Sequence, residues 1–244
     1  MQLFYTPDHA RVGDVIPYYE NGEFKLFYLK NWNPYFGSDK TYGWHLLTTK
    51  DLIHYESETA IGILGGTGCI IKVEGLYHLY YCVFEDQPQR QYVCHATSTD
   101  LTNWTKYPDE TFGPDESIYL LTDWRDPHVI WNEEEKCWWM ILCAQNQGNT
   151  KRRGCVGLCK SADLHHWTCC EPLYAPQSSM SAYECPDLFY MNGWWYLVFS
   201  QFTDRFQTLY RMSRSCNGPW IRPKTDSFDG RAFYAAKTCS DGEH

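Results

Sequence analysis

The chain has 244 residues, of which 43% are apolar and 17% are aromatic, and its formal net charge is −9. This length and composition predict one domain, residues 1–244, with a substantial apolar core. The negative charge occurs without any run of Lys or Arg, which excludes a polybasic surface for nucleic acid or membrane and favours a small neutral ligand.

Short runs of aromatic and β-branched residues predict strands along the whole chain, with little helical periodicity. The first predicted hairpin pairs residues 15–19 with residues 23–29 through a turn at Glu20-Asn21-Gly22. Asn-Gly favours a hairpin because both residues tolerate positive φ. Similar hairpins are predicted within residues 69–81, 128–142 and 187–199. The chain is therefore predicted to be all-β.

A second pattern follows the hairpins: a hydroxyl residue, a gap, Asp-Leu, two further residues and an aromatic residue. It occurs at residues 49–55, 98–104 and 161–167. We expect the Asp to accept hydrogen bonds from backbone amides of the following turn, and the aromatic side chain to fold back onto the sheet. The pattern is therefore interpreted as structural. A fourth unit lacks Asp-Leu but keeps its closing Trp220.

Repetition of one strand-built unit at this spacing predicts the blades of a β-propeller. The expected blades cover residues 13–60, 61–110, 120–172 and 182–222, and a fifth begins at residues 228–244. The predicted fold is a five-bladed β-propeller that is incomplete in its fifth blade. The exposed strand edges of an unclosed propeller would invite pairing with another chain.

The twelve cysteines are expected to be reduced thiols, because the predicted core is large and many of them lie in or beside apolar strands. Cys155 with Cys159, or Cys169 with Cys170, lacks the second pair that a zinc site needs. We expect no metal and no cofactor. No stretch reaches the roughly 18 apolar residues of a membrane span, and residues 1–7 do not resemble a leader, so a cytoplasmic protein is expected.

Three acidic residues lie where the first strand of a blade begins: Asp14, Asp126 and Glu184. The first strands of a propeller line its central funnel, so these carboxyl groups are predicted to converge. Glycosidic bond cleavage needs two or three such groups. Each acid alone is more often a turn or capping residue, but their equivalent positions in the repeats favour a site.

Two segments resemble the diagnostic motifs of glycoside hydrolase family 32, the β-fructofuranosidases. They are Arg125-Asp126-Pro127 and Glu184-Cys185-Pro186-Asp187-Leu188-Phe189, and residues 94–98, 103–104, 157–167 and 233–235 match in order. The resemblance implies a five-bladed propeller of the family 32/43 type that hydrolyses fructosides with retention of configuration. Within residues 1–244 we expect no counterpart of the β-sandwich that usually follows this propeller.

Carried over by motif, the resemblance implies that Glu184 is the general acid/base and that Asp126 stabilises the transition state. Arg125 would neutralise and orient the neighbouring carboxylates, and Asp14 would be the nucleophile, with Asp8 as a rival. The first motif departs from the family, because Gly13 replaces an Asn and Leu29 stands where a Gln is common. The fructose specificity is therefore less firmly implied than the chemistry.

A small carbohydrate is the expected partner. Trp32, Tyr35, Trp44, Tyr183 and Phe202 are candidates for stacking on sugar rings, although core packing is the commoner role of such residues. The predicted substrate-binding set is Arg125, Thr67, Trp44, Tyr183 and Trp32, whereas His45 and His128 are interpreted as ordinary strand histidines.

Two alternatives stay open at this point. One is arabinoside or xyloside specificity on the same propeller, as in the related family 43, whose members also use three funnel carboxylates and commonly invert. The other is a carbohydrate-binding propeller without catalytic activity.

Overall fold

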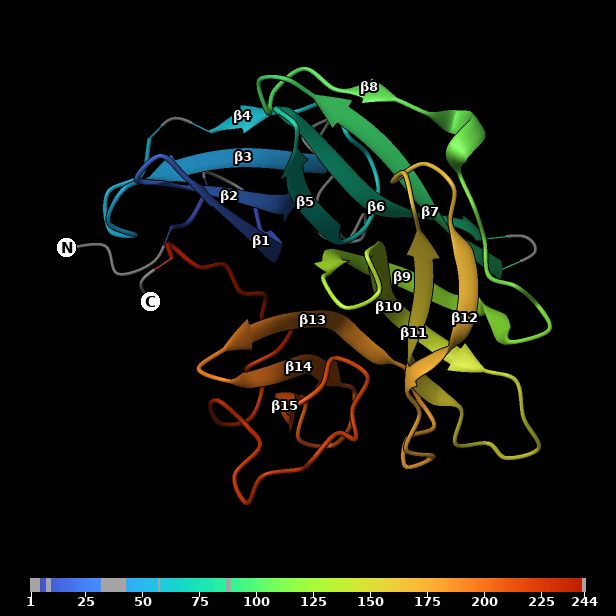
Figure 1. Ribbon diagram of the computed structural model, residues 1–244. Helices are drawn as coiled ribbons and strands as arrows, with labels where there is room; N and C mark the ends of the chain where they lie inside the picture. The colour runs from blue at the N-terminus through green and yellow to red at the C-terminus, as the bar shows by residue number, and fades with distance from the viewer. Residues whose placement is uncertain (1–4, 8–9, 32–42, 57, 87–88, 243–244) are drawn as a thin grey trace.

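A computed structural model describes residues 5–7, 10–31, 43–56, 58–86 and 89–242 (Figure 1). Their strands form four antiparallel sheets, each a meander of consecutive strands. The first sheet contains β1 (Val12–Glu20), β2 (Glu23–Lys30), β3 (Gly43–Thr49) and β4 (Thr59–Ala60). The second contains β5 (Gly68–Val73), β6 (Leu76–Asp86), β7 (Gln89–Ser98) and β8 (Thr105–Lys106).

The third sheet contains β9 (Tyr119–Asn132), β10 (Cys137–Asn146), β11 (Gly154–Ser161) and β12 (Thr168–Tyr174), and the fourth contains β13 (Tyr183–Met191), β14 (Trp194–Gln201) and β15 (Gln207–Ser213). A short 3-10 helix, η2 (Pro108–Glu110), follows β8. No helix among the described residues is long and apolar enough to cross a membrane. The all-β propeller prediction is confirmed.

The predicted hairpin turns form with the expected backbone. Asn21 and Gly22 have φ of 54° and 79°, which is the positive pair that a two-residue turn between twisted strands needs. Asn192 and Gly193 repeat it with φ of 51° and 80°. The strands around these turns extend further than predicted. β9 begins at Tyr119, for example, well before the predicted start at His128.

The Asp-Leu pattern is a structural turn, as predicted. In the third copy, Asp163 Oδ1 accepts the backbone N–H groups of His165 and His166, both at 2.9 Å. Ser161 Oγ accepts the N–H of Leu164 at 2.9 Å, and Leu164 has a positive φ of 70°. The copies at Asp51 and Asp100 make the same contacts.

Three apolar clusters hold the four blades together, one at each interface between successive blades. The first joins residues such as Phe27 and Leu79, the second joins Tyr80 and Met140, and the third joins Ile141 to later residues. Because neighbouring side chains of a strand point to opposite faces, each middle blade contributes to two clusters. This explains why β6 and β10 are apolar on both faces.

The first strands of the blades converge at the centre of the molecule. β5 contacts β1 on one side and β9 on the other, and β9 also contacts β13. Residues 228–242 form no named strand, so the fifth blade stays a prediction. This segment instead runs from the fourth sheet toward β1 (Figure 1). It is held to β13, where Lys237 Nζ donates to Pro186 O at 2.6 Å and Thr238 N donates to Asp187 Oδ2 at 2.6 Å.

Candidate active site

Each strand that carries a predicted acid has a β-bulge at the acid. The pairing register shifts between Gly13 and Ile16 in β1, and similar shifts occur in β9 and β13. The bulges place Asp14, Asp126 and Cys185 at positive φ values of 33°, 56° and 47°. A bulge bends the strand and re-aims its side chains, and bulges are common beside active sites.

The three acids were predicted to occupy equivalent positions in their blades, and the bulges show that one of them does not. Asp14 and Asp126 occupy the same bulge position, but Cys185 holds that position in β13. Glu184 lies one residue earlier, at the position that Arg125 occupies in β9. The sequence placed all three acids near strand starts but did not reveal this one-residue offset. The offset brings Glu184 beside Arg125 rather than beside another aspartate.

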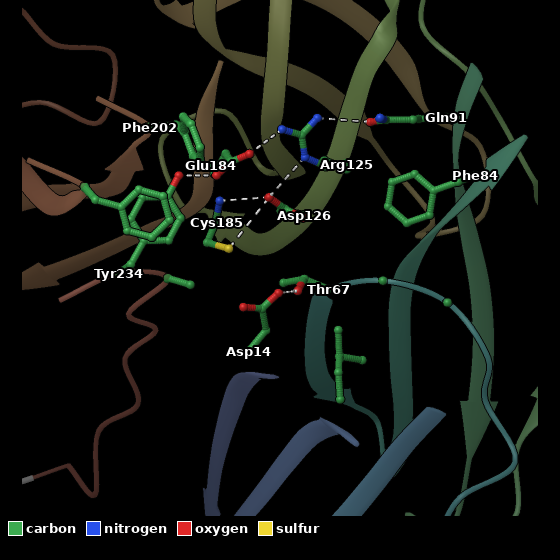
Figure 2. Close-up of a pocket in the computed structure, with 15 residues that line it drawn as sticks. Asp14, Thr67, Phe84, Gln91, Arg125, Asp126, Glu184, Cys185, Phe202 and Tyr234 are labelled. Atoms are coloured by element: carbon green, nitrogen blue, oxygen red, sulfur yellow. Dashed lines mark hydrogen bonds and ion pairs between the residues drawn. The ribbon is translucent and has the colours of Figure 1, made fainter. Parts of the chain in front are cut away.

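One cavity of about 510 Å³ collects these residues at the centre of the propeller (Figure 2). Five residues of the predicted catalytic and substrate-binding sets line it: Asp14, Thr67, Arg125, Asp126 and Glu184. The other lining residues are Leu29, Gly65, Gly66, Phe84, Gln91, Cys185, Phe202, Phe206, Tyr234 and Ala235. Asp14 and Thr67 enter from the first two blades and face the acids of the third and fourth across the cavity.

Arg125 contacts several of the acidic and amide side chains around the cavity. Its Nη2 donates to Glu184 Oε1 at 2.5 Å, and its Nε lies 3.9 Å from Asp126 Oδ2. Nη1 donates to Asp123 and to Gln91 Oε1, the latter at 3.3 Å. One guanidinium therefore touches several acceptors in a fixed planar geometry, which an ammonium cannot do.

The two aspartates of the cavity are both partly desolvated. Burial raises the pKa of Asp126, which is 5% exposed, although the neighbouring Arg125 opposes that rise. The Asp126 carboxylate also accepts the backbone N–H of Cys185 at 2.9 Å. Burial likewise raises the pKa of Asp14, while a hydrogen bond from Thr67 lowers it.

The Glu184 carboxylate is held from both sides. Arg125 contacts Oε1, and the hydroxyl of Tyr234 donates to Oε2. Burial, together with the hydrogen bond to Glu184, raises the pKa of Tyr234, so its phenol keeps its proton at neutral pH. The Tyr234 ring stacks on Phe206 with centroids 4.0 Å apart, which fixes the direction of the hydroxyl.

Comparison with known proteins gives a family match. The family model for the N-terminal domain of glycosyl hydrolases family 32 matches residues 15–244. The chain belongs to glycosyl hydrolase family 32. The match includes Asp126 and Glu184 and begins one residue after Asp14.

Several relatives and solved structures are similar to most of the chain. A levanbiose-producing levanase of Bacillus subtilis (strain 168) is 26% identical, over 96% of this chain and 45% of its own length. A sucrose-6-phosphate hydrolase of Escherichia coli is 30% identical, over 64% of this chain and 34% of its own length. The chain thus spans about half the length of these relatives, or less.

Two solved structures share the fold. A GH32 β-fructofuranosidase of Bombyx mori superposes with a TM-score of 0.67 and 23% identity, over 88% of this chain and 49% of that chain. An exo-inulinase of Aspergillus awamori superposes with a TM-score of 0.68 and 17% identity, over 93% of this chain and 52% of that chain.

Two predicted sugar-binding aromatics are instead core residues. Tyr183 is 1% exposed, packs on Phe199 and shares a hydrogen bond with Ser178 at 2.9 Å. It precedes Glu184 on a strand, so its side chain points to the opposite face. Trp44 is also 1% exposed, and it lies in the cluster between the first two blades. The prediction that they contact substrate is therefore wrong.

Trp44 holds a segment of backbone that lines the cavity. Its Nε1 donates to Gly66 O at 3.1 Å, which anchors the Gly65-Gly66 segment that leads to Thr67. A Cβ at Gly66 would lie 2.7 Å from Cys82 Sγ, so this close approach needs glycine. Trp32, Tyr35 and the rival acid Asp8 lie outside the described residues.

The mouth of the cavity carries exposed aromatic rings. Phe84 is 52% exposed and Phe202 is 61% exposed, and both line the cavity. Exposed rings beside a pocket that contains carboxyl groups suit the apolar face of a sugar. Phe202 was a predicted candidate, whereas Phe84 gave no distinguishing signal in the sequence.

Tyr234 and Gln91 line the cavity, but they were not predicted from the sequence as site residues. Tyr234 lies in the segment expected to begin a fifth blade, and its contact with Glu184 spans 50 residues of chain. Gln91 belongs to β7, not to the first strand of a blade, and it accepts the N–H of Trp124 at 2.9 Å as well as the Arg125 contact. The Phe233-Tyr234-Ala235 match to family 32 was the one signal that pointed to Tyr234.

Proposed function

We propose that this protein hydrolyses β-fructofuranosides, such as sucrose, fructo-oligosaccharides or fructans, with retention of configuration. The observation that carries the proposal is the convergence of Asp14, Asp126 and Glu184, from three separate blades, on one cavity. Membership of family 32 and the similarity to a levanase and to a sucrose-6-phosphate hydrolase support the fructoside reading.

In the first step the Asp14 carboxylate attacks the anomeric carbon of the fructosyl unit and forms a glycosyl ester. Glu184, in its protonated form, gives its proton to the departing glycosidic oxygen as the bond to the anomeric carbon breaks. In the second step Glu184 removes a proton from water, whose oxygen attacks the anomeric carbon. The ester bond breaks and releases the Asp14 carboxylate.

Asp126 stabilises the transition state in this scheme. Its buried carboxylate is held by Arg125 and by the Cys185 N–H, so it offers a fixed negative charge to the oxocarbenium-like sugar. Thr67 orients the nucleophile through its hydrogen bond to Asp14. Leu29 lines the same cavity, so this wall offers an apolar surface where the family commonly places an amide.

Among the alternatives, the family 32 match favours fructosides over the arabinosides of family 43. Removing three carboxyl groups from water in one cavity costs folding free energy, and a purely carbohydrate-binding role would not require this cost. The gathering of the three acids in one cavity therefore favours catalysis.

The test is turnover on a substrate panel of sucrose, inulin, levan and an arabino-oligosaccharide. We expect reducing sugar to be released from fructosides, and Glu184→Gln to lower the rate by roughly 10²–10⁴-fold on unactivated substrates. Glu133→Gln is the matched control, because the side chain of Glu133 is 75% exposed. Arabinoside turnover without fructoside turnover, or a fully active Glu184→Gln variant, would overturn the proposal.

A further inference from the structure

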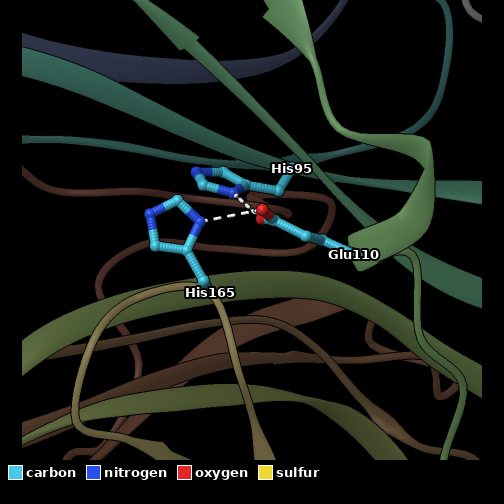
Figure 3. Close-up of side chains that lie close together, drawn as sticks. All are labelled: His95, Glu110 and His165. Carbon is cyan, nitrogen blue, oxygen red and sulfur yellow. Dashed lines mark hydrogen bonds and ion pairs between the residues drawn. The ribbon is translucent and has the colours of Figure 1, made fainter.

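A second cluster of chemically active side chains lies between the second and third blades. His95 from β7, Glu110 from η2 and His165 from the turn after β11 bring their polar atoms together (Figure 3). Nδ1 of His95 lies 2.5 Å from Glu110 Oε2, and Nδ1 of His165 lies 2.8 Å from Glu110 Oε1. None of these residues lines the catalytic cavity.

The fold holds His165 in place independently of this contact. His165 follows Asp163 and Leu164 in the Asp-Leu turn, at the position that Ile53 and Thr102 occupy in the other copies. The turn is fixed by its own hydrogen bonds, and Tyr80 OH on the second blade donates to Leu164 O at 2.6 Å. The imidazole is therefore presented to the second blade by a turn already tied to that blade.

His95 is held by its own contacts within the second blade. It is 2% exposed and stacks on Tyr80 with ring centroids 4.6 Å apart. Its Nε2 lies 3.0 Å from Nδ1 of the buried His78. A histidine that binds a metal through Nδ1 carries its proton on Nε2, and a second group must then accept that proton in a hydrogen bond. His78 Nδ1 is such an acceptor when the His78 ring carries its proton on Nε2.

We propose that His95, Glu110 and His165 form a binding site for one divalent metal ion, with zinc as the ion that suits the donors best. Two imidazole nitrogens and one carboxylate oxygen are a donor set that zinc takes in proteins. The three donor atoms lie within 4.8 Å of one another. Tetrahedral bonds of roughly 2.0–2.2 Å require donor atoms about 3.3 Å apart, so small side-chain rotations suffice.

The environment suits an ion that enters from solvent. The side chains of Glu110 and His165 are 21% and 38% exposed, which leaves room for water as a fourth ligand. Since the ligands come from two blades, the ion would link the blades and stabilise the folded chain.

The experiment uses the whole chain, stripped of metal with a chelator and then titrated with Zn²⁺ alone. We expect one zinc ion per chain, and a Tm increase of roughly 5–10 °C at zinc concentrations about 100 times the Kd. Glu110→Gln and His165→Asn should each weaken zinc binding by more than the roughly 10–100-fold that a supporting residue costs. His166→Asn is the matched control, because that side chain is 89% exposed and its Nδ1 contacts Asp163 Oδ2.

Cobalt as a probe separates this site from the twelve cysteines. The proposal predicts a Co²⁺ complex without the near-ultraviolet charge-transfer band that thiolate ligands produce. A thiolate band would overturn it. Unchanged zinc affinity in both Glu110→Gln and His165→Asn, or no saturable zinc binding by the parent chain, would also overturn it. All of these readouts are independent of fructoside hydrolysis.

Discussion

Arg125 Nη2 lies 2.5 Å from Glu184 Oε1, although 59 residues separate them and they belong to different blades. The contact follows from the bulges, because Glu184 occupies in β13 the position that Arg125 occupies in β9. A cation and an acid at matching positions of adjacent blades meet at the axis. The resemblance to family 32 implied this orienting role for Arg125, and the geometry supports it.

Replacing this arginine tests whether the planar contact matters. Arg125→Lys keeps the charge but cannot reach Glu184, Asp123 and Gln91 together. We expect kcat/KM on fructosides to fall by roughly 10–100-fold, the loss of about 1.5–3 kcal/mol for one charge-assisted hydrogen bond. Arg153→Lys is the control, since Arg153 donates to the backbone carbonyls of Thr150 and Gly148 and does not line the cavity. Equal kinetics in the two variants would contradict this role.

The hydroxyl of Thr67 is expected to set the acid limb of the pH profile. Attack requires ionised Asp14, and burial raises the pKa of Asp14 above its ordinary value of 3.8 while Thr67 lowers it. Thr67→Val removes the lowering contact, so the pKa rises further and activity is lost at a higher pH as the solution is acidified. Thr67→Ser keeps a hydroxyl and should keep the profile. The measurement is kcat/KM against pH. An acid limb that does not move in Thr67→Val would contradict the assignment of Asp14.

Tyr234 is predicted to position Glu184. Tyr234→Phe removes the donor to Glu184 Oε2 but keeps the ring stacked on Phe206. We expect kcat to fall by roughly 10–100-fold, with a smaller change in KM, because the acid/base has lost a partner that positions it. Tyr190→Phe, at a tyrosine that is 60% exposed, should leave both unchanged. A kcat identical to the parent's would show that the hydroxyl does not act through Glu184.

The Asp-Leu turn should contribute to stability rather than to activity. Ser161→Ala leaves the buried N–H of Leu164 without its acceptor, which destabilises the fold by about 1–3 kcal/mol. For a chain of this size the Tm should fall by roughly 2–4 °C per kcal/mol. Thr168→Ala, at an exposed position nearby, is the control. Thermal unfolding together with kcat at 25 °C checks this. Unchanged Tm, or lost activity in the folded variant, would contradict it.

Local patterns predicted much of the fold because each acts over a few residues. The Asn21-Gly22 turn and the hydrogen bonds of Asp163 follow from backbone preferences that the sequence displays directly. The three acids were found because blade starts repeat along the chain. Side chains alternate between the two faces of a strand, so whether one points to the funnel depends on its position along the strand. A bulge shifts this alternation by one residue. This is why Tyr183 was placed in the site although it faces the core.

Contacts across long stretches of chain gave no such local signal. Tyr234 reaches Glu184 because the segment after the fourth sheet turns back across the funnel, and no periodic pattern marks that path. The cluster of His95, Glu110 and His165 likewise joins a strand, a short helix and a turn from two blades. Metal-ligand spacing in the sequence could not indicate it, because 55 residues separate Glu110 from His165.

The most direct test of the catalytic assignment is to trap the ester on Asp14. The Glu184→Gln variant is incubated with a fructosyl fluoride, whose leaving group needs no acid, and the chain is then digested and analysed by mass spectrometry. Without Glu184 to activate water, the intermediate should accumulate. We predict one fructosyl adduct on the peptide that contains Asp14, absent from the Asp14→Asn, Glu184→Gln double variant. An adduct on another carboxylate would contradict the account. Turnover of the fluoride without any adduct, at a rate that adding Asp14→Asn to Glu184→Gln leaves unchanged, would also contradict it.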